Sequence, residues 1–275
     1  MRGRPARRAV LAGAGWALAL ALLSPYLVML FTALKPAAEL RTTPPRLLPV
    51  AWQPGNFLDV LRDPAFQSWL SVSLVVAAAS TALVILAAVP AAYYTARHRF
   101  PGRGAFLFLV LVTQMFAPTA LVVGLYRQFF ELDLVNTYTA LILTNAAFNL
   151  AFAIWMLRAF FASIPREIEE AAAVDGCGRL RTLAGIVLPL SLPGIVTAAV
   201  FAFIAAWNEY IVALTLMTDP AMKPLTVGIT TYVTAYVQHW NSLFAASVLA
   251  IVPVVVLFAL IERYLVGGLT AGSLK

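Results

Sequence analysis

Six long apolar stretches constrain what this chain can fold into. They cover residues 9–34, 70–95, 104–126, 137–158, 190–217 and 243–266. A helix needs about 20 mostly apolar residues to cross the hydrocarbon core of a bilayer. Each stretch is long enough, and 62% of the chain is hydrophobic whereas only 11% is charged. The sequence therefore predicts an all-α membrane protein with six transmembrane helices.

The basic residues predict its orientation. Most of the 19 lysines and arginines lie before the first stretch or just after the second, fourth or sixth stretch. In a chain that crosses the membrane once per stretch, these positions all fall on the same side. Positive residues concentrate in cytoplasmic loops, so we expect both termini in the cytoplasm. The first stretch begins after four arginines but is too long for a signal peptide and lacks a clear cleavage site. We therefore expect it to be retained as a helix.

The chain shows no internal repeat and no low-complexity linker, which predicts a single domain over residues 1–275. It would consist of the N-terminal helix at 9–34 and a helical core at about 65–266. A proline-rich loop of about 33 residues follows the first helix. Its end, residues 56–70, is expected to form a helix at the membrane interface.

A charged insert at residues 163–189 separates the fourth and fifth stretches. Ser163 and Pro165 suit the start of a helix, because a proline in the first turn loses no needed N–H group. Three glutamates follow, where the helix dipole favours negative charge. Asp175-Gly176 then predicts a tight reversal, since glycine tolerates the left-handed conformation. A second short helix would run toward Pro189. The pattern alone also fits a merely solvated loop.

Several segments resemble a known family. Glu170-Ala171-Ala172, Asp175-Gly176 and Ile186-x-Leu188-Pro189 resemble the EAA coupling loop of binding-protein-dependent ABC importer permeases. The segments WNEYIVALTL (207–216), KPLTVGI (223–229) and 239–275 are similar to the maltose-type carbohydrate branch, and RHRFPGRG (97–104) resembles its first cytoplasmic turn. Six helices with a short N-terminus resemble the shorter of that branch's two permease subunits.

The resemblance implies a prokaryotic cytoplasmic (inner) membrane protein that forms half of a sugar translocation path. Its partners would be a second permease, a cytoplasmic ATPase dimer and an extracytoplasmic sugar-binding protein. The residues implied in ATPase coupling are Glu170, Ala171, Ala172, Asp175, Gly176, Leu188 and Pro189. Taken by itself, Glu170 could equally be an ordinary surface carboxylate, which contributes little energy.

The chain carries no motif for binding ATP. A phosphate-binding loop ends in Gly-Lys-Ser/Thr, but the only lysines are Lys35, Lys223 and Lys275, each preceded by leucine or methionine. We therefore expect partner subunits to bind ATP and Mg²⁺, and no cofactor, metal or catalytic site in this chain. The two histidines have no carboxylate at catalytic spacing, and the single cysteine excludes an internal disulfide framework.

Polar residues within the apolar stretches are candidates for the translocation path. Such residues are costly in lipid and usually face a bundle interior or water, and amides offer sugar hydroxyls both a donor and an acceptor. The candidates are Gln114, Asn145, Asn149, Asn208 and Glu209. Hydrogen bonding between helices is an alternative for each of them. Glu209 needs a partner or water, and we expect it to face the cavity.

Other functions remain open at this point. A permease for glycerol phosphate, an amino acid or betaine would share the coupling loop. A secondary transporter would usually show inverted repeats, which are not visible here. Nucleic-acid binding is not favoured, because the arginines are spread over separate loops instead of one face.

Overall fold

The computed structural model describes residues 4–44, 46–234 and 238–270, with side chains from residue 11 to residue 262. Arg2 and Lys275, two of the basic residues behind the predicted orientation, lie outside the described residues. Within the described ranges the secondary structure is helical, apart from one isolated bridge between Val233 and Gln238. The prediction of an all-α protein is confirmed.

The chain divides into two compact units, and the first consists of residues 1–67 and 229–252. It holds α1 (Arg4–Ala33), the 3₁₀ helix η1 (Glu39–Arg41), α2 (Gly55–Arg62), η4 (Ile229–Tyr232) and the first part of α13 (Trp240–Thr270). Asn56 fixes the end of α1, because its Nδ2 donates to the carbonyl oxygens of Ala33 and Lys35 at 2.8 and 2.9 Å. The Tyr232 hydroxyl donates to Asp63 at 2.8 Å, and burial together with this carboxylate raises the pKa of Tyr232.

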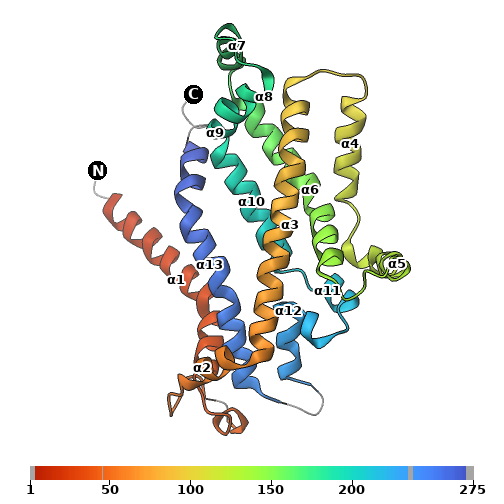
Figure 1. Ribbon diagram of the computed structural model, residues 1–275. Helices are drawn as coiled ribbons and strands as arrows, with labels where there is room; N and C mark the ends of the chain where they lie inside the picture. The colour runs from red at the N-terminus through yellow and green to blue at the C-terminus, as the bar shows by residue number, and fades with distance from the viewer. Residues whose placement is uncertain (1–3, 45, 235–237, 271–275) are drawn as a thin grey trace. The chain divides into compact units, whose positions relative to one another are not determined.

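The second unit consists of residues 68–228 and 253–275. Most of α3 (Pro64–Arg97) belongs to it, and in Figure 1 α7 and α8 stand at one end of this unit, with α11 and α12 at the other. The remaining elements are α4 (Arg103–Thr113), α5 (Pro118–Glu131), α6 (Tyr138–Ser163), α7 (Arg166–Val174), α8 (Arg179–Thr182), the π-helical turn η2 (Leu183–Val187), α9 (Leu188–Leu190), α10 (Leu192–Trp207), α11 (Ile211–Leu216), η3 (Pro220–Met222), α12 (Leu225–Gly228) and the last part of α13.

Four described helices are long and apolar enough to cross a membrane by themselves: Leu11–Ala33, Pro64–Arg97, Tyr138–Ser163 and Trp240–Glu262. Two bent pairs pass the same test when each pair is taken together, which gives up to six spans. One pair joins α4 to α5 through a 93° bend, and the other joins residues 179–190 to α10 through a 75° bend.

Two of the six predicted apolar stretches are each divided between two helices. Residues 104–126 form α4 and α5, because Ala117 precedes Pro118 and takes an extended conformation with ψ 134°. Proline disfavours the helical region for the residue before it. Residues 190–217 form α10 and α11 and are interrupted at Asn208–Tyr210. The interfacial segment 56–70 is likewise divided by Asp63 into α2 and the start of α3.

Small residues hold the second unit together. A core cluster joins α3, α6, η2 and α10, and seven of its buried residues are alanines: Ala88, Ala92, Ala96, Ala146, Ala153, Ala198 and Ala202. Gly194 lies so close to α6 that a Cβ added there would stand 2.5 Å from the ring of Phe160. Small side chains allow helices to approach closely in membranes, where dispersion contacts and not the exclusion of water drive helix association.

A second core cluster joins α3, α5, α6 and α11. Asn136, with a positive φ of 60°, lies in the turn before α6 and connects it to the end of α11. Its Oδ1 accepts from the backbone N–H groups of Thr218 and Asp219 at 2.7 and 2.9 Å, and its own N–H donates to Leu216. The second halves of both divided stretches, α5 and α11, therefore pack in one cluster with α3 and α6.

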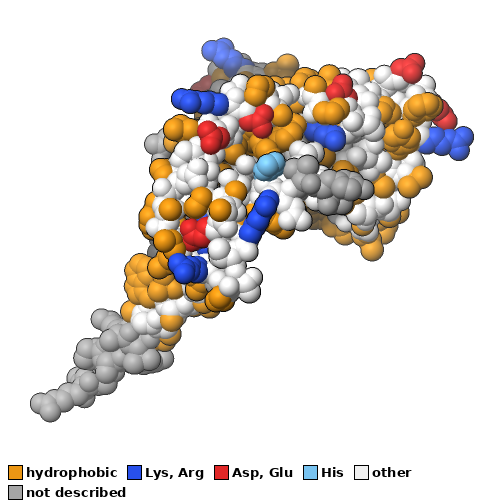
Figure 2. Space-filling model, turned by 90° about the horizontal axis from the view of Figure 1, so that it is seen from below, with side chains coloured by type: hydrophobic (Ala, Val, Ile, Leu, Met, Phe, Trp, Pro, Cys, Tyr) orange, Lys and Arg blue, Asp and Glu red, His pale blue; other side chains and the backbone are white. Residues whose placement is uncertain are grey.

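Charged side chains are sparse on the surface. On the face that Figure 2 shows, the coloured lysine and arginine side chains are scattered, some of them beside acidic side chains. Hydrophobic side chains are exposed on the long helices; examples are Trp16 (73% exposed), Leu86 (74%) and Phe108 (67%). Exposed apolar surface of this extent suits a chain surrounded by lipid or by membrane partners.

Candidate functional site

The charged insert forms a helix, a reversal and a second helix. The backbone hydrogen bonds at the end of α7 define a Schellman motif: Cys177 N–H donates to Ala172 O at 2.9 Å, and Gly176 N–H donates to Ala173 O at 3.1 Å. Gly176 has a positive φ of 78°, which suits a residue without Cβ. The reversal predicted at Asp175-Gly176 is present.

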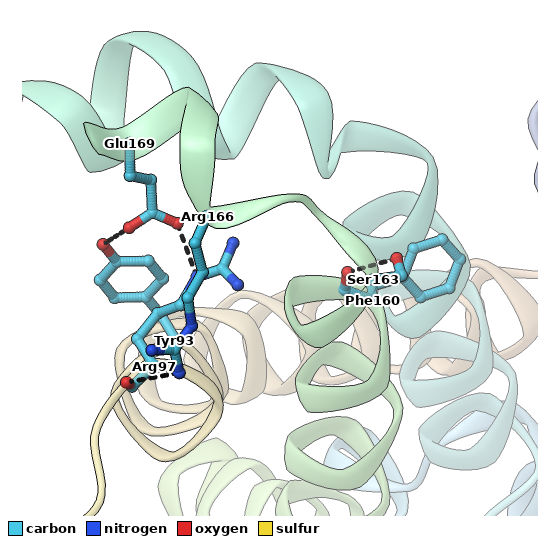
Figure 3. Close-up of polar contacts among 6 residues, drawn as sticks. All are labelled: Tyr93, Arg97, Phe160, Ser163, Arg166 and Glu169. Atoms are coloured by element: carbon cyan, nitrogen blue, oxygen red, sulfur yellow. Dashed lines mark hydrogen bonds and ion pairs between the residues drawn. The ribbon is translucent and has the colours of Figure 1, made fainter. Parts of the chain in front are cut away.

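The start of α7 differs from the prediction. Helix α6 continues to Ser163, and the Ser163 hydroxyl donates to Phe160 O at 2.7 Å, so it belongs to the end of α6 and does not cap α7 (Figure 3). Pro165 precedes the first residue of α7 and makes no side-chain hydrogen bond there. Two glutamates, Glu167 and Glu169, lie in the first turn of α7, where the dipole of the helix favours negative charge.

Glu169 turns toward the end of α3 and contacts two of its side chains (Figure 3). Its Oε1 lies 2.6 Å from Nε of Arg97, and its Oε2 accepts a hydrogen bond from the Tyr93 hydroxyl at 2.8 Å. The side chains of Arg97 and Glu169 are 7% and 19% exposed. Arg166 completes the cluster, because its Nη2 donates to the backbone oxygen of Arg97 at 3.2 Å. A buried ion pair therefore connects α7 to α3.

A cleft of about 260 Å³ lies beside this ion pair. Glu170 and Arg179 lie along it and are both exposed. Its other lining residues are Tyr93, Arg97, His98, Arg166, Glu169 and Ala173. The cleft thus presents charges of both signs.

The residues of the EAA pattern differ in exposure. Glu170, Ala171, Asp175 and Gly176 are exposed, whereas Ala172 is only 4% exposed. Ala172 therefore packs within this chain. Leu188 is half-buried and packs against the core cluster of α3, α6 and α10, and Pro189 is exposed next to it.

Sequence reasoning missed three residues of this site. Glu169 was noted only as one of three glutamates near the start of a helix, and its pairing with Arg97 was not predicted. Val174 and Leu180, at the tip of the insert, are 88% and 82% exposed. The apolar type of the latter two was visible in the sequence, but their exposure depends on how the two short helices fold back.

The amides proposed for the translocation path are engaged with backbone oxygens. Asn145, which is 3% exposed, donates to Leu141 O at 2.9 Å, and Asn149 donates to Asn145 O at 2.8 Å. Asn208 donates to Ile204 O at 2.9 Å. Gln114 lies at the break between α4 and α5 and donates to Phe148 O of α6 at 2.8 Å, so it connects two helices. Their contact with a solute remains a prediction.

Glu209 occupies the interruption between α10 and α11. Its two carboxylate oxygens accept from the N–H groups of Val212 and Ala213 at 2.7 and 2.9 Å. Its backbone oxygen accepts from the Thr226 hydroxyl at 2.7 Å. The hydrogen-bond partners that a carboxylate needs at this position are thus the backbone N–H groups at the start of α11. Separately, the described residues include no group of three or more histidine, cysteine, aspartate or glutamate side chains that could hold a metal ion.

The fold and this insert can be compared with other proteins. Residues 10–270 match the family described as "Binding-protein-dependent transport system inner membrane component". The chain belongs to this family. The permease is 40% identical over 253 residues to the sulfoquinovosyl glycerol transport system permease protein SmoH of Agrobacterium fabrum. The alignment covers 92% of this chain and 89% of SmoH.

Two further relatives align over most of the permease. The trehalose/maltose transport system permease protein MalG of Thermococcus litoralis is 37% identical and covers 80% of each chain. The diacetylchitobiose uptake system permease protein DasC of Streptomyces coelicolor is 31% identical and covers 92% of each. In the crystal structure of a bacterial ABC transporter involved in the import of the acidic polysaccharide alginate, one chain superposes with a TM-score of 0.82 at 24% identity, covering 96% of the permease and 98% of that chain. The permease therefore shares the fold of that chain.

Proposed function

We propose that the permease is the transmembrane subunit of an ATP-driven carbohydrate importer and forms half of its translocation path. The observation that carries this proposal is its alignment along most of its length with relatives whose names specify sulfoquinovosyl glycerol, trehalose or maltose, and diacetylchitobiose. These solutes all contain sugar rings. Permeases for glycerol phosphate, amino acids or betaine are the alternative.

We place the permease in the prokaryotic cytoplasmic membrane with six spans and both termini in the cytoplasm. Counting each bent helix pair as one span supports the number six. An even number of spans brings the two termini to the same side. The insert between α6 and α10 would then face the cytoplasm, where its arginines agree with the usual excess of positive charge.

The insert would be the coupling element that docks on the ATPase. An exposed carboxylate alone contributes little, so the argument rests on the surface as a whole. That surface combines Glu170 and Asp175 with two large apolar side chains, Val174 and Leu180, all exposed at a charged segment. A groove on the partner that holds an arginine and an apolar pocket would complement it. Leu188 and Pro189 would carry the motion into α10.

The importer would need further subunits. A cytoplasmic ATPase dimer would bind ATP and Mg²⁺, a second permease would complete the path, and an extracytoplasmic sugar-binding protein would deliver the solute. A second solved structure is that of a bacterial alginate ABC transporter in complex with alginate pentasaccharide-bound periplasmic protein. One of its chains superposes with a TM-score of 0.66 at 15% identity. This likeness concerns the fold alone, and it is compatible with the proposed assembly. Gln114, Asn149 and Asn208 would line the path through their amides.

The test is transport by the reconstituted complex. The permease would be produced with its second permease, ATPase and binding protein and placed in proteoliposomes containing MgATP. Uptake and ATP hydrolysis would be measured with maltose, trehalose, sulfoquinovosyl glycerol and diacetylchitobiose, and with glycine betaine and an amino acid as controls. We expect one of the sugars to stimulate both activities. Stimulation by a control solute, and by no sugar, would contradict the carbohydrate assignment.

A further inference from the structure

We propose that Glu169, Arg97 and Tyr93 form a clamp that makes the end of α3 move together with α7. The proposal rests on the proposed function, in which α7 receives motion from the ATPase. It adds a second route for that motion into the membrane helices, besides the covalent route through α6 and α10. Glu169 is then a positioning residue that acts on a helix distant in the chain.

The geometry of the clamp suits this role. Glu169 uses both carboxylate oxygens, one toward Arg97 at 2.6 Å and one toward Tyr93 at 2.8 Å (Figure 3). Tyr93 and Arg97 are four residues apart and so lie on one face of α3. Two contacts from one side chain resist rotation as well as separation, whereas a single contact would act as a pivot. Glu169 and Tyr93 are 76 residues apart in the sequence. Their contact is therefore a tertiary contact, and it adds to the covalent connection along the backbone.

The burial of the clamp makes it costly to open. Arg97 is 7% exposed at its side chain, and its Nη2 is buried without a hydrogen-bond partner in the structure. Moving Glu169 away would leave this guanidinium buried and uncompensated, which is strongly unfavourable. The same pair at an exposed surface would exchange freely with water. The end of α3 is therefore expected to follow α7 when α7 is pushed.

Neighbouring contacts support the clamp at both ends. Arg166, the first residue of α7, donates from Nη2 to the backbone oxygen of Arg97, which is one of the carbonyl groups left free at the end of α3. Ile164, just before α7, and Leu183, just after α8, pack against the core cluster that contains Ala92 and Ala96 of α3. The clamp thus joins the first turn of α7 to a helix that the flanking residues of the insert also touch.

The chain offers a matched control on the same helix. Glu167 lies two residues before Glu169 in the first turn of α7 and is exposed. Replacing either residue with alanine removes one negative charge from the same helix turn. The two variants therefore share their effect on the helix dipole, and they differ in the contact with α3.

The experiment is hydrogen exchange of the full importer in nanodiscs, with and without MgATP–vanadate. Exchange would be read in peptides covering residues 91–98, at the end of α3, and residues 166–177, over α7. In the wild type and in Glu167→Ala we expect nucleotide to change exchange in both regions. In Glu169→Ala we expect the change over α7 to remain and the change at residues 91–98 to be clearly smaller than in Glu167→Ala.

A response at residues 91–98 in Glu169→Ala equal to that of the wild type would overturn the clamp. Absence of any nucleotide response over α7 in the wild type would instead contradict the proposed function, and with it the motion that the clamp is said to pass on.

A charge swap between Arg97 and Glu169 is the second arm of the experiment. Arg97→Glu or Glu169→Arg alone should lose the response of α3, whereas the double variant should regain it. Recovery in the double variant would show that the pairing itself, and not either residue alone, carries the response, so failure of the swap to restore the response would count against the clamp.

Discussion

The carboxylate of Glu209 lies at the interruption between the helices α10 and α11. The N–H groups at the start of a helix have no partner within that helix. Two such groups at the start of α11, those of Val212 and Ala213, donate to the carboxylate. In an apolar environment an unsatisfied N–H is expensive, so this side chain allows the interruption between α10 and α11 to persist.

This role predicts the effect of removing the carboxylate. In Glu209→Ala the two N–H groups lose their acceptors, and we expect the free energy of unfolding to fall by about 1–3 kcal/mol. Glu209→Gln keeps one acceptor oxygen and should lose less. Thermal unfolding in detergent would measure both variants. Equal midpoints for the alanine variant and the wild type would contradict the capping role.

Gly176 gives a second prediction for a single residue. Its φ of 78° costs a residue with a Cβ about 1–2 kcal/mol, and more when the side chain is β-branched. Gly176→Val should therefore distort the reversal and abolish uptake, while the amount of permease in the membrane stays normal. The matched control is Gly178→Val. Gly178 has an extended conformation with φ −70°, and no atom lies within 4 Å of an added Cβ at either glycine.

Uptake and immunoblotting of membranes would measure both glycine variants. We expect Gly178→Val to transport normally, because valine adopts extended conformations readily. If Gly176→Val transports as well as Gly178→Val, at equal abundance, the reversal does not matter for function.

The two acidic neighbours in α7 show what residue types can and cannot predict. The reversal at Asp175-Gly176 was predictable because its signal is local: glycine after a run of helix-forming alanines. The partner of Glu169 was not predictable, since Glu169 and Glu170 carry the same chemistry. Which of them faces inward depends on where Arg97 lies, more than 70 residues earlier in the chain. The residue types around α7 do not show which of the two glutamates lies next to Arg97 in the folded chain.

At the scale of elements, α6 and α10 depend on a close approach. Gly194 faces Phe160, and a Cβ there would stand 2.5–2.8 Å from three ring atoms. Gly194→Ala should therefore force the helices apart and destabilise the permease by about 1–3 kcal/mol, as overpacking does. Thermal unfolding in detergent would measure the loss.

Two variants test whether the loss comes from this contact. Phe160→Leu in the Gly194→Ala background should recover part of the stability, because it removes the ring atoms that the new methyl group meets. Gly104→Ala, in α4, adds the same methyl group where no atom lies within 4 Å and should not destabilise. A loss in Gly194→Ala that Phe160→Leu leaves unchanged would show that the cost arises elsewhere.

The elements also show where apolar periodicity is insufficient. Hydropathy located the four helices that are long and apolar enough to cross a membrane by themselves, because length and composition are enough to recognise a segment that suits lipid. It could not locate the bend between α4 and α5, where Pro118 fixes its own backbone and that of Ala117. An apolar stretch with an internal proline has the same mean hydropathy whether it runs straight or turns by 93°.

At the scale of the whole molecule, the exposed surface of the insert differs in kind from that of the long helices. The apolar window of α1 is 0% buried, but lipid alone could cover an apolar helix. Lipid could not cover α7 and α8, which combine exposed charges with the exposed side chains of Val174 and Leu180. A protein surface can satisfy both kinds of group at once, since interfaces combine an apolar centre with a polar rim.

The docking hypothesis predicts that reversing one charge on this surface releases the ATPase. Glu170 is exposed beside the cleft, and pairing with a basic residue of the ATPase would desolvate it at the interface. Close interfacial charge pairs can contribute several kcal/mol, and a reversal adds repulsion to the loss of attraction. We therefore expect Glu170→Lys to weaken association at least about tenfold, which corresponds to about 1.4 kcal/mol.

The control is Glu167→Lys, which makes the same change of charge on the same helix at another exposed position. Both variants would be purified through a tag on the permease, and the ATPase retained would be quantified at low and at moderate salt. Loss in Glu170→Lys alone would support a specific contact. Equal loss in both variants would indicate a general electrostatic attraction, which salt screens over about 8–10 Å. Full retention in Glu170→Lys would contradict the role assigned to this carboxylate.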